Sequence, residues 1–297
     1  MPAVVSHFYF GERMIERFED ESITKHRDAF NLGLQGPDPL FFLHFNKKYN
    51  KTGTLIHDTK IKELFVAMSD YIKRTGDEIA KAYFLGFLCH YALDKHSHPY
   101  VEYKLITHPM YVPMSKIPRH FLLESGMDYM VVKDKYGQDP AEFRKDVLVA
   151  SDKKTWRAIA AMMTQTVLPV FGAEMSMSTS VKTYSRMFKV FKFLYDPKKK
   201  KNRFFSALEK FFRIPPYITT FSTPVAESPE QDWCNKEHKA YGDDGKSLDF
   251  YEIIDEAIVS ADALLAAAVK SLSGGIDIPD ELFDRDYGGE CLVCKST

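Results

Sequence analysis

The sequence has no long uninterrupted apolar run. Its longest apolar-rich stretches cover residues 158–163 and 261–269, far short of the ~20 residues that a membrane-spanning helix needs. The first residues carry neither a basic start nor an apolar segment of signal-peptide length. We therefore expect a soluble protein that is not secreted by the usual route.

Cysteine is also scarce, with 4 residues in a chain of 297. This number is too small for a disulfide scaffold, so a reducing compartment and a cytoplasmic location are expected. Cys291 and Cys294 form a CxxC pair, which could be half of a zinc site, a redox pair or neither. Cys234 and His238 have ligand-like spacing, but we interpret them as packing or surface residues.

The chain carries no excess of charge of either sign. Its 40 Lys and Arg residues balance 41 Asp and Glu residues, for a net charge of −1 at pH 7. Such a balance provides no global field that would attract nucleic acid. With 45% hydrophobic residues the chain is long enough to bury a sizeable core.

Strand signals are few, whereas apolar residues recur at helical spacing. Ile61, Leu64, Phe65, Met68 and Ile72 have the i, i+3, i+4, i+7, i+11 pattern of an amphipathic helix. The sequence therefore predicts an all-α fold. The predicted helices cover residues 8–20, 26–33, 58–73, 77–98 (ending before Pro99), 116–136, 140–150, 152–171, 180–195, 202–212 and 248–272, and the predicted loops residues 36–39, 50–53, 197–201, 215–216 and 274–275.

Residues 187–213 combine many phenylalanines with a lysine run at 198–201. One interpretation is two core-packed helices joined by a solvated basic turn. The other is an interfacial hairpin that touches anionic lipid through the lysines, with phenylalanine side chains entering the headgroup region. Peripheral membrane contact through 187–213 follows from the second interpretation.

Three residues at helical spacing are the most informative pattern. His90, Asp94 and His98 are at i, i+4 and i+8, so on a helix they project from one stripe. Two imidazoles and a carboxylate suit a borderline cation such as zinc. His96 lies two positions from its neighbours and points away, so we exclude it.

A second pair, His120 and Glu124, repeats the spacing of His90 and Asp94. A single pair of this kind is common as a surface contact, but two pairs in a chain with 10 histidines favour a shared role. Their apolar neighbours place both helices in the interior, where an ionisable side chain needs a partner or a metal. A buried metal cluster would meet that need.

Three further candidates come earlier in the chain. Asp38 lies between two prolines in the 36–39 loop, which could hold a carboxylate at a fixed point. His57 stands at the head of the predicted 58–73 helix, and His7 follows Ser6 at the start of the chain. Taken singly, each has an ordinary alternative as a turn, surface or capping residue.

As an ordered set these motifs resemble the zinc-dependent phospholipase C family, which shares its helical fold with the single-strand-specific zinc nucleases. The set consists of an early Ser-His, a Gly-Pro-Asp loop, an isolated His, His-x-x-x-Asp-x-x-x-His-Pro and His-x-x-x-Glu, and it covers roughly residues 5–130. The resemblance implies a multi-helix bundle with a metal cluster in its core. It also implies one domain over 1–297, with a ligand-bearing core at about 5–136 and a helical C-terminal extension at about 137–297.

The resemblance further implies two zinc ions, with a third site in some relatives. One ion would be held by Asp38, His57, His90 and Asp94, another by His98, His120 and Glu124, and a third by His7 with Asp94 as the bridging carboxylate. This chain departs from the secreted relatives because it lacks their N-terminal Trp. His44 competes with His57, which we prefer because we expect it to head a helix.

The function implied is zinc-dependent hydrolysis of a phosphodiester, with phospholipid as the expected substrate. A metal-bound hydroxide would be the nucleophile, and Asp38 would orient it or accept its proton. Two alternatives stay open: a single-strand nuclease that stacks bases on Tyr100, Tyr103 and Tyr111 beside Lys104, and a non-catalytic protein in which zinc only ties the helices together. Nucleic acid is the less favoured substrate because the net charge is close to zero.

Overall fold

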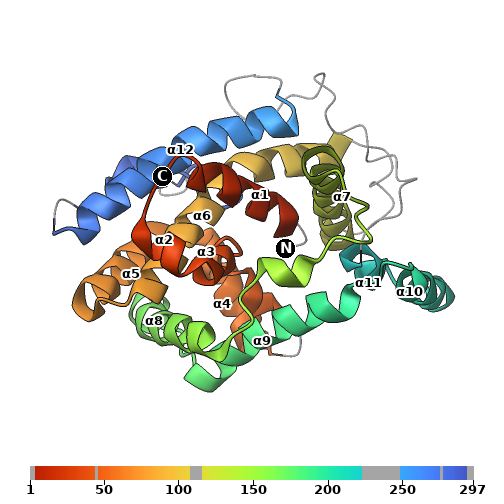
Figure 1. The fold of residues 1–297 in the computed structure, drawn as a ribbon, viewed down its shortest axis with the longest axis horizontal. Coiled ribbons are helices and arrows are strands. Elements are labelled where there is room, and N and C mark those ends of the chain that lie inside the picture. The colour runs from red at the N-terminus through yellow and green to blue at the C-terminus, as the bar shows by residue number, and fades with distance from the viewer. Residues whose placement is uncertain (1–3, 44–45, 108–115, 223–247, 275–276, 293–297) are drawn as a thin grey trace.

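The computed structural model describes residues 4–43, 46–107, 116–222, 248–274 and 277–292 (Figure 1). Within these ranges the chain forms α-helices and no strand beyond an isolated bridge between Arg285 and Cys291, which confirms the all-α class. The helices are α1 (Val4–Ile15), α2 (Glu21–Lys25), α3 (Arg27–Gly33), α4 (Lys47–Asp58), α5 (Ile61–Thr75), α6 (Glu78–Thr107), α7 (Lys116–Tyr136), α8 (Lys153–Phe171), α9 (Met177–Leu194), α10 (Lys200–Phe211), α11 (Tyr217–Phe221) and α12 (Phe250–Leu272). The 3-10 helices are η1 (Asp38–Phe42), η3 (Lys145–Leu148) and η5 (Asp280–Phe283).

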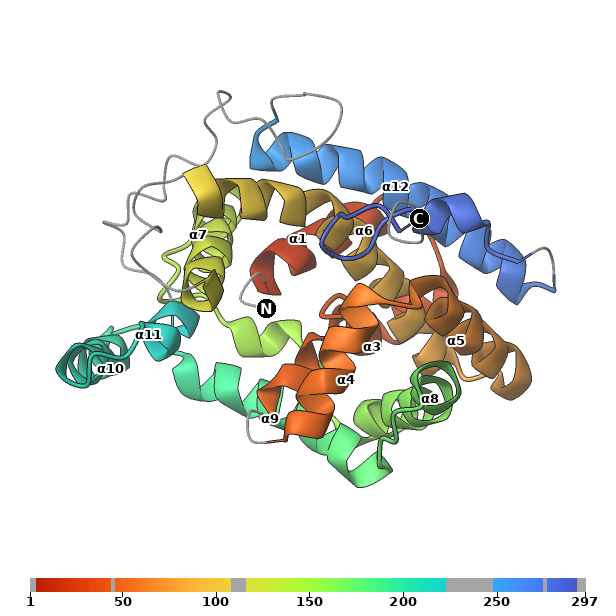
Figure 2. The ribbon, with the colours of Figure 1, turned by 180° about the vertical axis from the view of Figure 1, so that it is seen from behind.

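Helix α6 runs through the interior, with α12 lying along it in both ribbon views (Figure 1 and Figure 2). From Ala80 to Lys95 all of its side chains but one are buried. A helix that is apolar on all sides needs cover on all sides. Helices α1, α2, α3, α5, α7, α8 and α12 all pack against α6 and provide that cover.

Helix α3 crosses α6 at very short range because two glycines meet there. A Cβ atom on Gly33 would lie 2.2 Å from the carbonyl oxygen of Tyr83, and one on Gly86 would lie 2.2 Å from that of Phe30. A side chain at either position would therefore push the two helices apart. The close crossing brings residues 36–38 onto the middle of α6.

Aromatic rings fill the space between α5, α6 and η5. The ring of Phe65 lies 5.3 Å from that of Phe87, 5.9 Å from that of Tyr91 and 5.6 Å from that of Phe283. Full burial of a side chain of this size contributes about 1.5–3 kcal/mol. The cluster therefore fixes the C-terminal segment beside α6.

The predicted end of the central helix was wrong. Helix α6 does not stop before Pro99 but continues to Thr107. A proline inside a helix removes the hydrogen bond to the carbonyl four residues earlier, here that of Lys95. The packing of α6 against its neighbours outweighs this loss.

Two other local predictions were also wrong. Residues 50–53 are not a loop but lie inside α4. Gly53 fits there because a Cβ atom would come within 2.9 Å of the Phe41 ring. Residues 140–150 hold only the short η3, where the Arg144 guanidinium donates to Asp146 at 2.6 and 2.7 Å, a contact between residues that do not face each other on an α-helix.

The C-terminal half of the chain packs against the first half. Helix α8 lies against α5, α9 against η1, and α12 against α1, α5 and α6. The arrangement of these elements around α6 is visible from both sides of the molecule (Figure 1 and Figure 2). A single domain over residues 1–297 stays a prediction.

None of the helices in the described ranges combines the length and the apolar character that crossing a bilayer requires.

Candidate metal centre

The candidate metal ligands gather around one stripe of α6, where His90, Asp94 and His98 follow one another by helical turns. His90 is fully buried, Asp94 is 5% exposed and His98 is half-buried. Three groups of His, Asp and Glu side chains converge here, and in each group the candidate ligand atoms lie within 4.8 Å of one another. The groups are A (His7, His90, Asp94), B (Asp38, His57, His90) and C (His98, His120, Glu124).

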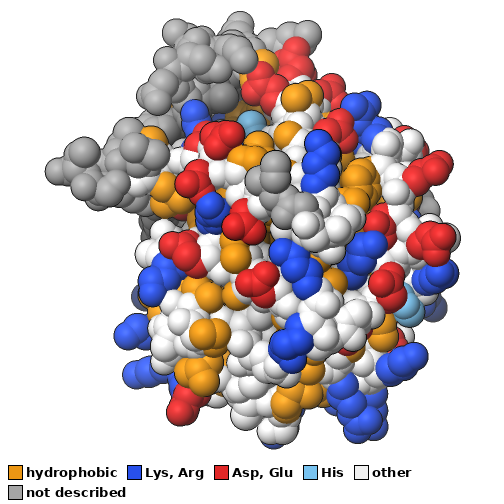
Figure 3. Space-filling view, turned by 90° about the vertical axis from the view of Figure 1, so that its left-hand side faces the viewer, with side chains coloured by type: hydrophobic (Ala, Val, Ile, Leu, Met, Phe, Trp, Pro, Cys, Tyr) orange, Lys and Arg blue, Asp and Glu red, His pale blue; other side chains and the backbone are white. Residues whose placement is uncertain are grey.

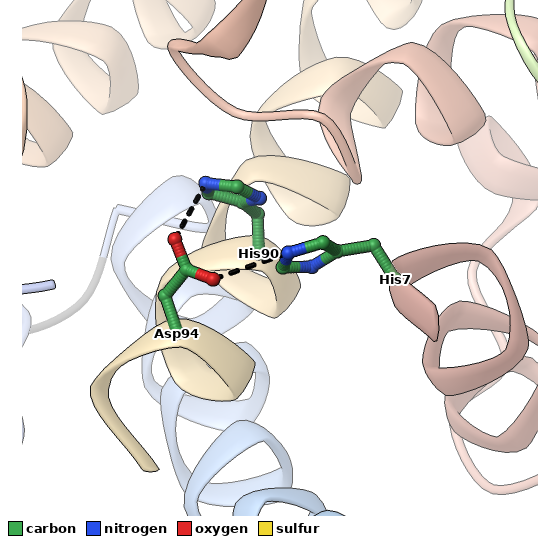
Figure 4. Close-up of side chains that lie close together, drawn as sticks. All are labelled: His7, His90 and Asp94. Atoms are coloured by element: carbon green, nitrogen blue, oxygen red, sulfur yellow. Dashed lines mark ion pairs between the residues drawn. The ribbon is translucent and has the colours of Figure 1, made fainter. Parts of the chain in front are cut away.

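Group A joins α1 to α6 (Figure 4). The Asp94 carboxylate lies between two imidazoles, with 3.1 Å from Oδ1 to Nε2 of His7 and 3.1 Å from Oδ2 to Nε2 of His90. The two rings are stacked with their centroids 4.3 Å apart. All three side chains are buried.

Group B brings η1 and α4 to the same histidine of α6. Nε2 of His57 lies 3.3 Å from Oδ1 of Asp38, and the rings of His57 and His90 meet edge to face at 6.4 Å. His90 therefore belongs to both groups, A and B. A cation in group A and one in group B would be neighbours, and Nε2 of His90 could bind one of them.

Group C joins the next part of α6 to α7. Oε1 of Glu124 lies 3.0 Å from Nε2 of His120 and 3.5 Å from Nε2 of His98. Nδ1 of His98 is also 4.0 Å from Oδ2 of Asp94. Asp94 thus connects group C to group A.

Backbone carbonyls orient the imidazoles. Nδ1 of His57 lies 2.8 Å from the carbonyl oxygen of Gly53. Nδ1 of His90 lies 3.1 Å from that of Leu34, and Nδ1 of His98 lies 2.5 Å from that of Tyr287. Because a carbonyl oxygen only accepts, Nδ1 carries a proton in each ring. Nε2 is then the nitrogen that can bind a metal when the ring is neutral. Metal-bound histidines typically have a second contact of this kind.

The turn at Gly36 packs directly against the ring of His90. The residue has a φ of +48°, and a Cβ atom there would lie 2.1 Å from Cδ2 of His90. Glycine is needed on both counts, since other residues rarely adopt this φ and would collide with the ring. The Gly-Pro-Asp loop thereby holds Asp38 next to its histidine partners.

A buried carboxylate of α7 fixes the start of α1. Oδ1 of Asp128 accepts hydrogen bonds from the backbone N–H groups of Val5 and Ser6 at 3.0 and 2.9 Å and from Oγ of Ser6 at 3.1 Å. These N–H groups belong to the first turn of a helix, where they have no partner within the helix. The contact determines where His7 lies relative to α6.

The charges of the site are strongly coupled. Burial alone would raise the pKa of Asp94, but the imidazoles of His90, His98 and His7 outweigh it and hold the pKa well below its ordinary value. Burial would lower the pKa of His98, yet the carboxylates of Asp94 and Glu124 raise it to about 9. Without a cation His98 therefore carries a second proton at neutral pH, whereas burial and the neighbouring His90 lower the pKa of His7.

The residues present fit zinc. Ligand atoms about 2.0–2.2 Å from one tetrahedral zinc lie about 3.3–3.6 Å apart, close to the 3.0–3.5 Å between nitrogen and oxygen atoms within the groups. Nε2 of His90 and Nδ1 of His7 are buried without a hydrogen-bond partner, which costs about 1–3 kcal/mol each. A cation bound at Nε2 of His90 would remove that cost there.

The structure brings all eight candidate residues from the sequence into the three groups, namely His7, Asp38, His57, His90, Asp94, His98, His120 and Glu124. Their role as ligands stays a prediction. His96 belongs to none of the groups, and His44 lies outside the described residues. His57 does not head a helix as expected; it lies in the last turn of α4.

Three supporting residues were not found from the sequence: Asp128, Leu34 and Tyr287. The latter two act through their backbone carbonyls, which carry no side-chain signal, and Tyr287 lies 189 residues beyond its histidine partner. Of the CxxC pair, Cys291 is half-buried and Cys294 lies outside the described residues, as do Cys234 and His238. Any role of these cysteines stays open.

A family model described as zinc dependent phospholipase C matches residues 6–176. The matched range is more than half of the chain and contains all the residues of groups A, B and C, but not Tyr287. No curated protein and no solved structure matches the chain.

Proposed function

The chain belongs to the zinc-dependent phospholipase C family, and we propose that it hydrolyses the phosphodiester bond of a phospholipid with zinc ions held by groups A, B and C. The main support is that three ligand groups meet along one helix, inside the range that the family model matches. Groups A and B share His90, and Asp94 connects group C to group A. Neighbouring cations are what an in-line displacement at phosphorus uses.

Zinc in these groups would act as a Lewis acid toward the phosphoryl oxygens and lower the pKa of water. The protein's own side chains determine which groups of the site are ionised. Burial opposes ionisation of Asp38, but the surrounding positive charges, including the imidazoles of His57 and His90, lower its pKa to about 2. Asp38 is therefore an ionised acceptor at neutral pH, suited to orient the attacking water.

Two alternatives fit the observations less well. A closed structural zinc site needs four ligands, whereas eight side chains converge here in three groups. A single-strand nuclease would need exposed stacking platforms, but Tyr100 and Lys104 are buried, at 0% and 3% exposure. Tyr111 lies outside the described residues.

Metal analysis combined with hydrolysis assays tests the proposal. The purified protein is assayed against bis-p-nitrophenyl phosphate, phosphatidylcholine and single-stranded DNA, with its zinc content measured alongside. We expect zinc to co-purify with the protein, and bis-p-nitrophenyl phosphate and phosphatidylcholine to be cleaved. The His90→Ala variant should lose both its zinc and its activity. His96→Ala is the matched control on the same helix.

Three results would contradict the proposal. Unchanged zinc content in His90→Ala would remove group A and group B as metal sites. Full zinc content without turnover of any substrate would favour the structural alternative. Preferential cleavage of DNA would favour the nuclease.

A further inference from the structure

One segment of the chain concentrates positive charge. Residues 182–213 contain 11 Lys or Arg and 2 Asp or Glu, a net charge of +9 in a chain whose net charge is −1. The segment contains most of α9, all of α10 and the residues that connect and follow them. The two acidic residues, Asp196 and Glu209, both accept hydrogen bonds from backbone N–H groups within residues 200–219.

Three of the basic residues of α9 follow one side of the helix. Lys182, Arg186, Lys189 and Phe193 are at i, i+4, i+7 and i+11, and they line a surface groove of about 460 Å³. The groove begins beside Leu43, at the end of η1. It therefore starts next to the element that carries Asp38 and ends at an exposed phenylalanine.

Helix α10 has its apolar face turned outward. Phe204, Leu208 and Phe211 are at i, i+4 and i+7, and their exposed fractions are 60%, 36% and 79%. Phe212, at the end of the helix, is 61% exposed. A helix in a globular protein normally buries this face, so the core-packed interpretation of the segment holds for α9 but is wrong for α10.

The apolar surface is continuous between the two helices. The ring of Phe193, 56% exposed, lies 6.1 Å from that of Phe205, which lies 5.5 Å from that of Phe204. Nζ of Lys201 lies over the Phe193 ring, 4.9 Å from its centroid. Apolar and basic side chains thus alternate along one surface, called here the α9–α10 face (Phe193, Phe204, Leu208, Phe211 and Phe212, with Lys182, Arg186, Lys189, Lys200 and Arg203).

Polar contacts hold α10 in this orientation. Glu209, on the opposite side of the helix, is 7% exposed and accepts hydrogen bonds from the N–H groups of Ile218 and Thr219 at 2.6 and 3.3 Å. Asp196 accepts from the N–H groups of Lys200 and Asn202 at 3.0 and 2.8 Å. Turning the phenylalanines inward would break both sets of contacts.

We propose that the α9–α10 face docks the protein on an anionic phospholipid surface, with the phenylalanines entering the headgroup boundary and the basic residues contacting lipid phosphates. The inference rests on the proposed function, because a lipid surface presents the substrate. Charge complementarity excludes a second copy, which would bring +9 against +9. The exposed Leu208 offers no ring on which a base could stack, whereas a lipid headgroup boundary accepts aliphatic and aromatic side chains alike.

The position of the face in the fold agrees with docking. Helix α10 stands at the outer end of the molecule beyond α11 in both ribbon views (Figure 1 and Figure 2). Figure 3 shows the face on the left-hand side of Figure 1. Acidic and basic side chains are mixed there with small apolar patches, unlike on the α9–α10 face. That face lacks the excess of basic residues found in residues 182–213.

Vesicle co-sedimentation tests the proposal. The full chain is mixed with vesicles of phosphatidylcholine alone and of phosphatidylcholine with phosphatidylglycerol. We expect salt-sensitive binding to the mixed vesicles, about tenfold or more weaker for Phe204→Ser/Phe211→Ser and for Lys200→Glu/Arg203→Glu. Val259→Ser and Lys270→Glu, exposed on α12, are the matched controls and should bind like the parent protein.

Hydrolysis of soluble bis-p-nitrophenyl phosphate separates this inference from the proposed function, because it does not require a surface. Vesicle binding without any hydrolysis would retain the docking face and refute the enzyme. Equal vesicle binding by parent and variants would refute the docking face. So would a self-associated protein that the phenylalanine variants convert to monomer, or preference for single-stranded DNA over the mixed vesicles.

Discussion

His98 and Tyr287 are joined by a short hydrogen bond, with 2.5 Å between Nδ1 of His98 and the carbonyl oxygen of Tyr287. The N–H of the same tyrosine donates to the carbonyl of His57 at 3.3 Å, and its ring lies 5.0 Å from that of His57. One residue near the end of the described chain thus connects group B on α4 with group C on α6. The loop around it, residues 284–292, is a structural part of the candidate metal centre.

Replacement of Gly289 by alanine should loosen this loop. Gly289 has a φ of +78°, and a Cβ atom would lie 2.3 Å from Cγ of Pro99 and 2.8 Å from the carbonyl oxygen of Lys95. We expect the free energy of unfolding to fall by about 2–4 kcal/mol. Zinc affinity should fall about ten- to a hundredfold because the ring of His98 loses its orientation.

Gly137→Ala is the control for this variant. Gly137 has a similar φ of +62°, but a Cβ atom would meet nothing within 4 Å. It should cost about 1 kcal/mol of stability and leave zinc affinity unchanged. Titration calorimetry with zinc and chemical unfolding measure both quantities, and equal zinc affinity in the two variants would contradict the role of the loop.

Asp128→Ala should affect group A without touching a ligand. The variant leaves the buried N–H groups of Val5 and Ser6 without their acceptor, at a cost of about 2 kcal/mol. We expect weaker zinc binding as well, because His7 follows directly in the same turn. Asp249→Ala, which removes the cap of α12, should lose about 1 kcal/mol and keep its zinc; if both variants lose zinc alike, the effect is one of general stability.

The three groups should lose metal unequally. His90 belongs to groups A and B, whereas His120 belongs to group C alone. We therefore expect His90→Asn to lower the zinc content of the purified protein more than His120→Asn does. Mass spectrometry under native conditions counts the ions, and an equal loss in the two variants would contradict this arrangement.

The metal-free protein should lose stability at both ends of the pH scale. The carboxylates of Asp94 and Glu124 raise the pKa of His98 from 6.5 to about 9 against the effect of burial. This contribution is complete below pH 6.5 and disappears as the pH rises through about 9, a loss of about 3 kcal/mol. The lowered pKa of Asp94 acts in the opposite direction, since its contribution exists above pH 3.8 and is lost in stronger acid.

Thermal unfolding in the presence of a chelator checks this pH dependence. Zinc requires deprotonated imidazoles, so its addition should stabilise the protein most at the alkaline end. His98→Asn should show a flatter profile between pH 6.5 and about 9 in the chelated protein. An unchanged profile would show that another group titrates in this range.

The candidate site could be predicted from the sequence where its geometry is local. His90, Asp94 and His98 share a stripe because helical spacing alone places them there. The relation of His120 and Glu124 follows for the same reason. Which of these side chains face each other across helices came from the family resemblance, not from spacing.

The parts that could not be predicted depend on packing over long distances. The low helix propensity of Asn50 and Gly53 suggested a loop, but α4 forms there, and Gly53 packs so closely on the Phe41 ring that a Cβ atom would come within 2.9 Å of it. The helix continues through Pro99 because neighbouring elements hold it. The carbonyl of Tyr287 carries no signal in the sequence and lies outside the matched family range.

The hydrogen bond from Tyr287 has a consequence for biosynthesis. Because 189 residues separate the tyrosine from His98, a ribosome that adds ~5–20 residues per second needs roughly 10–40 s to pass from one to the other. Through that interval the nascent chain already presents imidazoles and carboxylates to the cellular metal pool, with one of its rings still unanchored. If groups A, B and C hold zinc as proposed, binding of all the ions would therefore be completed late, after Tyr287 has been synthesised.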